Sequence, residues 1–312
     1  IKITLADAMN SSDRLKFKLS TFQLRLIFLK DCFMRHPTES PLQAAHAIHA
    51  QAESDAQLLR SIEFQDLLKL NHTQVFVNTT LSWPWLILGW FLAYHTWYVP
   101  AVLATGMFYM LALRQAHDCY HKNIGLSPKS TQILLHVLAI AMLCVTHAVG
   151  FTHLQHHKHK LNEHDIEGSW SRKSAWSAIV LGWVFYYKIQ QNGLKNAPSR
   201  LKHRAYIDLA LIVAVLLLTA ISQYPLLVYH VASMLVCSCL VGFFALWSVH
   251  HGCDGEHDIA RTERRPWLNF ATAHLLFHVE HHTFPAVPCN HLPQLAKRMD
   301  EVVPHMTQKR VT

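Results

Sequence analysis

Charged residues are scarce in this chain of 312 residues. Asp, Glu, Lys and Arg make up 15% of it and hydrophobic residues 51%, whereas a soluble domain carries about 25% charged residues. Residues 75–113 and 209–251 contain no charged residue at all. Glycine is also scarce, with 10 residues. These shortages exclude a disordered chain, a collagen and an ordinary soluble enzyme.

The sequence also lacks the cysteine spacings of a disulfide framework or a zinc ribbon. It has 7 cysteines, an odd number, without a Cys-x-x-Cys pair and mostly among apolar neighbours. This pattern predicts reduced thiols in a reducing compartment.

Each of the two uncharged stretches is long enough for two membrane spans, because about 20 residues cross a bilayer core as a helix. Polar residues at 94–96 and 222–225 divide the stretches near their middles. We therefore predict an all-α integral membrane protein with four transmembrane helices in two hairpins.

Basic residues flank these spans on one side only. Lys and Arg occur before residue 75, between the two stretches and after the second, but not in the turns inside the hairpins. By the positive-inside rule, both termini and the middle segment are expected in the cytoplasm. The net charge of +8 is then explained by cytoplasmic loops, and we expect no nucleic-acid partner.

We divide the chain into an N-terminal cytosolic helical segment, residues 1–74, and a membrane domain, residues 75–312. One further stretch, residues 131–152, is uncharged and long enough to cross, although His136 and His147 interrupt it. If it crossed, the histidine clusters before and after it would face opposite sides of the membrane.

Histidine is abundant, with 25 residues, and eight of them form three clusters, one HxxxH and two HxxHH. On a helix, positions i, i+3 and i+4 share one face, so each cluster can direct its imidazoles to one point. Neutral imidazole binds iron, copper and zinc. Eight imidazoles are twice the number that a tetrahedral zinc site needs and suffice for two metal ions. The clustered residues are His117 and His121, then His153, His156 and His157, and finally His278, His281 and His282.

This arrangement resembles the membrane-bound fatty acid desaturase and hydroxylase superfamily, whose three histidine boxes bind a non-haem di-iron centre. The resemblance runs over residues 75–296 and is closest to desaturases in residues 278–288, His-Val-Glu-His-His-Thr-Phe-Pro-Ala-Val-Pro. The interval from His121 to His153 is also desaturase-like. The resemblance implies a cytosolic histidine-rich cap and interfacial helices, and it implies that residues 131–152 do not cross.

The family often has a ninth ligand at the cytoplasmic end of the fourth span. The candidates here are His250 and His251, of which we favour His251 slightly; adjacent residues point about 100° apart on a helix, so only one should reach the metals. Three carboxylates adjoin the boxes and could accept the distal N–H of a ligating imidazole. We prefer Asp165 for this role over Asp118 and Glu280.

The resemblance implies two Fe ions as cofactor, O2 as co-substrate and a fatty acyl substrate, held as free acid, acyl-CoA, acyl-carrier protein or lipid. Desaturation is the first expectation, and hydroxylation or decarboxylation to a terminal alkene is the alternative. The sequence contains no haem, flavin or iron–sulfur signature. An external electron donor such as ferredoxin, rubredoxin or a b-type cytochrome is therefore expected, together with membrane lipids.

The active site would then lie on the cytoplasmic face of a bacterial inner membrane or the endoplasmic reticulum. Two other functions would also use a histidine-rich membrane protein, namely metal handling without catalysis and zinc-dependent hydrolysis. Transport sites usually lie near the bilayer midplane, whereas these clusters lie at the ends of the predicted spans. The metal content distinguishes the three functions: about two irons per chain would indicate the oxidoreductase, one zinc the hydrolase, and variable, exchangeable metal the metal-handling protein.

Overall fold

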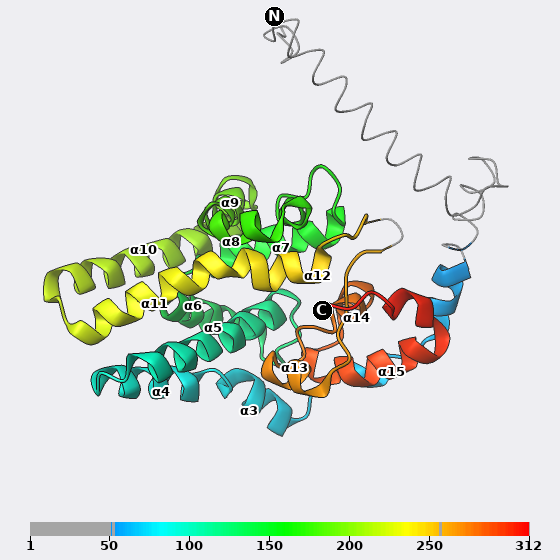
Figure 1. The fold of residues 1–312 in the computed structure, drawn as a ribbon, viewed down its shortest axis with the longest axis horizontal. Helices are drawn as coiled ribbons and strands as arrows, with labels where there is room; N and C mark the ends of the chain where they lie inside the picture. Colours follow the sequence, from blue (N-terminus) through cyan, green and yellow to red (C-terminus); the bar gives the residue numbers. More distant parts are fainter. Residues whose placement is uncertain (1–50, 52–53, 256–257, 312) are drawn as a thin grey trace, which may run out of the picture. The chain divides into compact units, whose positions relative to one another are not determined.

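The computed structural model describes residues 51, 54–255 and 258–311, which form helices and loops with no strand among them (Figure 1). The chain divides into two compact units, Ile1–Gln57 and Leu58–Thr312. In the first unit, only residues 51 and 54–57 are described, and they are helical. The predicted cytosolic segment, residues 1–74, therefore lies largely outside the described residues, and its last part, residues 58–74, belongs to the second unit.

Among the described residues, four helices are long and apolar enough to cross a membrane. Their ends agree with the predicted breaks, since the first pair is interrupted at residues 95–97 and the second at residues 223–224. The first and fourth spans are each assembled from shorter helical pieces. The spans are α3 (His72–Thr80) with α4 (Trp83–Tyr94), α5 (Tyr98–Tyr120), α10 (Ser199–Ser222), and α11 (Pro225–Val241) with the π-helical η4 (Gly242–Trp247) and α12 (Ser248–His250).

Shorter helices precede, connect and follow the spans. They are η2 (Gln65–Leu67), α6 (Pro128–Met142), α7 (Thr146–His159), η3 (Gly168–Arg172), α8 (Ala175–Val180), α9 (Gly182–Asn196), α13 (Pro266–Ala271), α14 (His278–Thr283), η5 (Cys289–His291), α15 (Leu292–Val302) and η6 (Pro304–Thr307).

Local sequence signals account for several helix ends. Asn71 and Gln74 form a capping box, in which each side chain accepts a hydrogen bond from the other residue's backbone N–H, and this satisfies two donors at the start of α3. Gln223 ends α10 in the left-handed conformation, and Pro225 then begins α11. A proline in the first turn suits a helix start, because no intrahelical partner awaits its missing N–H.

The helices α6 and α7 are bent by 106° relative to each other. Leu143, at the end of α6, adopts a left-handed conformation with φ of 51°, which stops the helix before α7 begins. Residues 131–152 therefore do not form one straight helix.

The buried carboxylate of Asp208 on α10 holds this bend. It accepts hydrogen bonds from Nδ1 of His136 (2.6 Å) and Nδ1 of His147 (2.8 Å). It also accepts the hydroxyl of Thr146 (3.1 Å) and the backbone N–H of His147 (3.0 Å). Because the residue is fully buried, these four donors replace the water that an ionised carboxylate would otherwise require.

We expect Asp208→Asn to lower the free energy of unfolding by about 3 kcal/mol, since it removes one partner from a buried polar network. The amide would also present donors to groups that themselves donate. Thermal melting in detergent measures the effect. Asp66→Asn is the matched control, because Asp66 pairs with Arg298 at the surface and should leave the melting temperature nearly unchanged. An Asp208→Asn protein with the same melting temperature as the wild type would contradict this role.

Candidate metal centre

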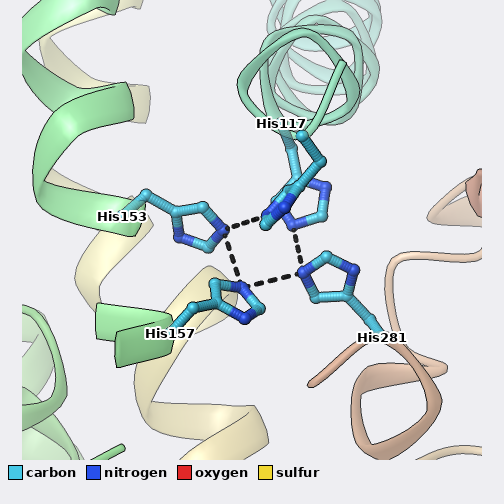
Figure 2. A group of neighbouring side chains, drawn as sticks. His117, His153, His157 and His281 are labelled. Atoms are coloured by element: carbon cyan, nitrogen blue, oxygen red, sulfur yellow. Dashed lines mark hydrogen bonds between the residues drawn. The ribbon is translucent and has the colours of Figure 1, made fainter. Parts of the chain in front are cut away.

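The three histidine boxes lie at or near helix ends that converge in space. The first box ends α5, the second occupies the C-terminal half of α7, and the third forms most of α14. Figure 2 shows His117, His153, His157 and His281, from these three segments, with their rings directed toward one another. Histidines far apart in the sequence therefore share one site.

Two groups of ring nitrogens can be distinguished among the described histidines. The first contains five residues whose Nε2 atoms approach one another at 2.9–3.2 Å, such as 2.9 Å between His157 and His281. The second contains four, with Nε2 separations of 3.0–3.2 Å. The first group is His117, His121, His153, His157 and His281, and the second is His156, His250, His278 and His282.

The second and third boxes each contribute to both groups. In the second box, His153 and His157 belong to the first group and His156 to the second. The third box is divided in the opposite sense, because His281 joins the first group while His278 and His282 join the second. In each box, the residues at i and i+4 belong to the same group and the residue at i+3 belongs to the other group. This follows from the slightly different directions of these positions on a helix.

The structure brings all eight box histidines together, and with them His250 rather than His251. Nε2 of His250 lies 3.1 Å from Nε2 of His156 and 3.0 Å from that of His278. The ring of His251 instead stacks on Trp247 at 4.2 Å between centroids. The slight preference for His251 therefore disagrees with the structure: helix α12 ends at His250, and His251 continues in an extended conformation.

Acceptors on the outer side orient several of these rings. Nδ1 of His156 lies 2.7 Å from Oδ2 of Asp165, the carboxylate preferred from the sequence. Nδ1 of His153 lies 3.2 Å from Oε1 of Glu167, and Nδ1 of His250 lies 2.8 Å from the carbonyl oxygen of Ile259. Because these partners only accept, the three Nδ1 atoms carry the proton and the Nε2 atoms present lone pairs inward.

With these tautomers, Nε2 lone pairs face each other with no proton between them, an arrangement that suits a bound cation. In their neutral forms, the rings that ligate metals, His156 and His250 both donate through Nδ1, so neither can donate from Nε2, yet their Nε2 atoms are 3.1 Å apart. Two lone pairs facing each other repel unless a positive ion lies between them. Ligands at right angles on an ion with metal–nitrogen bonds of about 2.1 Å would be about 3.0 Å apart. The observed spacing thus fits adjacent ligands of a metal ion.

The protonation states also favour metal binding. Burial lowers the pKa of His278, His281 and His282 well below the usual value for histidine, which keeps these rings neutral and able to ligate. Burial raises the pKa of Asp165, but the hydrogen bond from His156 and contacts with the backbone outweigh it, so the net pKa is lowered. Asp165 therefore remains an ionised acceptor.

Two acceptors that orient these imidazoles, Glu167 and the Ile259 carbonyl, were not predicted from the sequence. Glu280 was considered for this role, but it contacts other residues. Glu167 could have been found, since it is an acidic residue soon after the second box. The carbonyl of Ile259 could not, because every residue has one. Glu280, inside the third box, accepts from Thr262 at 2.7 Å and pairs with Arg264, so its carboxylate stabilises the chain around α14 rather than a box imidazole.

Comparison with known proteins gives two matches. A family model described as fatty acid desaturase matches residues 94–310. The chain is also 24% identical over 247 residues to an sn-1 oleoyl-lipid 12-desaturase of Anabaena variabilis. That match covers 72% of this chain and 61% of the relative's length, so the chain spans less than two thirds of that protein.

Proposed function

Since the chain belongs to the fatty acid desaturase family, we propose that it is an integral membrane oxidoreductase that introduces a double bond into a fatty acyl chain. The observation that carries the proposal is the convergence of nine imidazoles in two groups. Nine nitrogens exceed the coordination of one ion, whereas two ions can share them and keep positions for other ligands.

The two groups would hold one iron ion each, through the nine histidines of the first and second groups. Iron bound there would supply the activation of O2 and the removal of hydrogen from an unactivated C–H bond. Asp165, Glu167 and the Ile259 carbonyl orient three of the rings. Seven of the nine histidines, all except His121 and His157, are buried, which keeps the site largely free of bulk water.

The overall reaction requires external electrons. An acyl chain loses two hydrogens as a carbon–carbon double bond forms. One O2, two electrons and two further protons join those hydrogens to make two water molecules. The electrons would come from a separate ferredoxin, rubredoxin or b-type cytochrome at the cytoplasmic face, where four spans in two hairpins would place the boxes and both termini. The named relative acts on an oleoyl lipid, which favours a lipid-linked acyl chain here.

The test is product analysis with purified protein loaded with ferrous iron. Oleoyl phospholipid or glycolipid, oleoyl-CoA and free oleate would be offered with O2 and a reduced ferredoxin, and products would be followed by mass spectrometry. We expect the loss of two hydrogens from a lipid-linked chain, and no product from the zinc-loaded protein.

Other products would reassign the function. Gain of one oxygen would indicate hydroxylation, and loss of the carboxyl carbon from free oleate would indicate decarboxylation. Background oxygen uptake with every acyl substrate would contradict acyl oxidation and favour metal handling, or a zinc hydrolase if the protein retains a single zinc ion.

A further inference from the structure

Helix α5 carries a buried arginine one turn before the first box. Arg114 is 2% exposed and lies within the span Tyr98–Tyr120. Its Nη2 donates to Oδ1 of Asn290 at 2.6 Å and lies 3.3 Å from Oδ2 of Asp118, one turn further along. Ionisable residues inside membrane spans are costly and usually serve a function.

Several polar atoms around this pair have no hydrogen-bond partner in the part of the chain that the structure describes. They are buried and lie within one turn of α5, although buried polar groups in folded proteins are nearly always paired. Oδ1 of Asp118 lies 3.8 Å from Nδ1 of His117, which is too far for a hydrogen bond. The atoms without a hydrogen bond are Nε and Nη1 of Arg114, Nδ1 of His117 and Oδ2 of Asp118, which has only the ion pair with Arg114. The thiol of Cys289 also lies within 4.8 Å of the Asp118 carboxylate.

His117 thus differs from His153, His156 and His250, whose Nδ1 atoms each have an acceptor. Its Nε2 faces Nε2 of His281 at 3.0 Å inside the first group. If that Nε2 binds a cation, the proton of the neutral ring must lie on Nδ1 and needs an acceptor on the outer side. Asp118 is the carboxylate beside it.

We propose that Asp118 positions His117 by accepting its Nδ1–H, directly or through one water molecule, when the first group binds its metal ion. Arg114 acts through Asp118, because its guanidinium lies 3.3 Å from the carboxylate and holds it beside the ring. The inference rests on the metal binding proposed above, and it adds a negative charge next to the five-histidine group, which otherwise has Glu167 as its carboxylate partner.

Arg114 also connects the first box to the third. Asn290, its hydrogen-bond acceptor, lies in η5, a few residues after α14 ends. A guanidinium can serve both partners because its donors form a rigid, planar fork. The contact therefore couples the position of α5 to that of the segment that carries His281.

The experiment compares Asp118→Asn with Asp165→Asn, a matched control that removes the same charge beside His156 in the other group. The purified proteins would be loaded with iron-57, and iron content, the rate of iron release to a chelator and the Mössbauer spectrum would be measured. Loss of an outer carboxylate typically weakens metal binding 10–100-fold. We expect Asp118→Asn to release the iron of one Mössbauer doublet about 10–100-fold faster, and Asp165→Asn to release the other.

Arg114→Gln tests whether the arginine acts through Asp118. It should accelerate release of the same iron as Asp118→Asn, and the double variant should be no worse than Asp118→Asn alone. Asp118→Glu should recover part of the retention, because it restores a carboxylate. Removing one partner of a buried ion pair is itself destabilising, so iron release is compared below the melting temperature of every iron-free protein, which separates positioning from unfolding.

Distinct results overturn the inference and the proposed function. A wild type that holds two irons, together with Asp118→Asn and Arg114→Gln proteins that release them at the wild-type rate, overturns the positioning pair alone. Faster release in Arg114→Gln but not in Asp118→Asn also overturns it. A wild type that binds no iron overturns the metal centre and this inference together.

Discussion

Replacing His250 with alanine is expected to reduce acyl oxidation at least about 100-fold, whereas replacing His251 should leave it close to the wild-type rate. His250 is fully buried, its Nε2 approaches two other imidazoles, and the Ile259 carbonyl orients its ring. Even the loss of a group that only orients a ligand costs about 10–100-fold, so loss of the ligand itself should cost at least as much.

The measurement is product formation together with bound iron. His250→Ala should retain the iron of the five-histidine group and lose the other, while His251→Ala should retain both. His251 is a matched control, because it is the adjacent histidine and differs mainly in direction. If His250→Ala were active and His251→Ala inactive, His251 rather than His250 would be the ninth ligand.

A second large effect is expected for His281→Ala. The Nε2 of His281 lies 3.0 Å from that of His117 and 2.9 Å from that of His157, so it contacts both of the other segments that form the first group. We expect turnover to fall to background and bound iron to fall by about half, because one of two ions loses a central ligand.

His164→Ala provides the comparison for His281→Ala. His164 follows the second box but is exposed and pairs only loosely with Glu163, so this variant should keep its iron and its activity. Full turnover by His281→Ala, measured with iron-loaded protein, would remove the residue from the centre.

The spacing of the histidines within the boxes predicted that their side chains converge, and the uncharged stretches predicted the four apolar helices. An i, i+3, i+4 pattern places imidazoles on one helix face regardless of the surrounding fold, and the structure brings all eight together. The breaks near Tyr94 and Ser222 were visible because polar residues and a proline interrupt otherwise apolar runs. Both signals are local, and local signals are what a sequence shows directly.

The choice between His250 and His251 depended on features that a regular helix does not reveal. The π-helical turn at Gly242–Trp247 adds a residue per turn and so shifts the face of each residue that follows it. The helix then ends at His250, which turns the next side chain away. The Ile259 acceptor arises from tertiary folding, since it approaches His250 from a loop.

Helices α7 and α14 each supply nitrogens to both histidine groups, so moving either helix disturbs both groups at once. If α14 moved away, the first group would lose one nitrogen and the second would lose two; if α7 moved, the counts would be reversed. No displacement of one of these segments can therefore empty one position and preserve the other. Filling either position immobilises both helices and removes part of the ordering entropy that the second ion would have to overcome, so the two occupancies should rise together as metal is added.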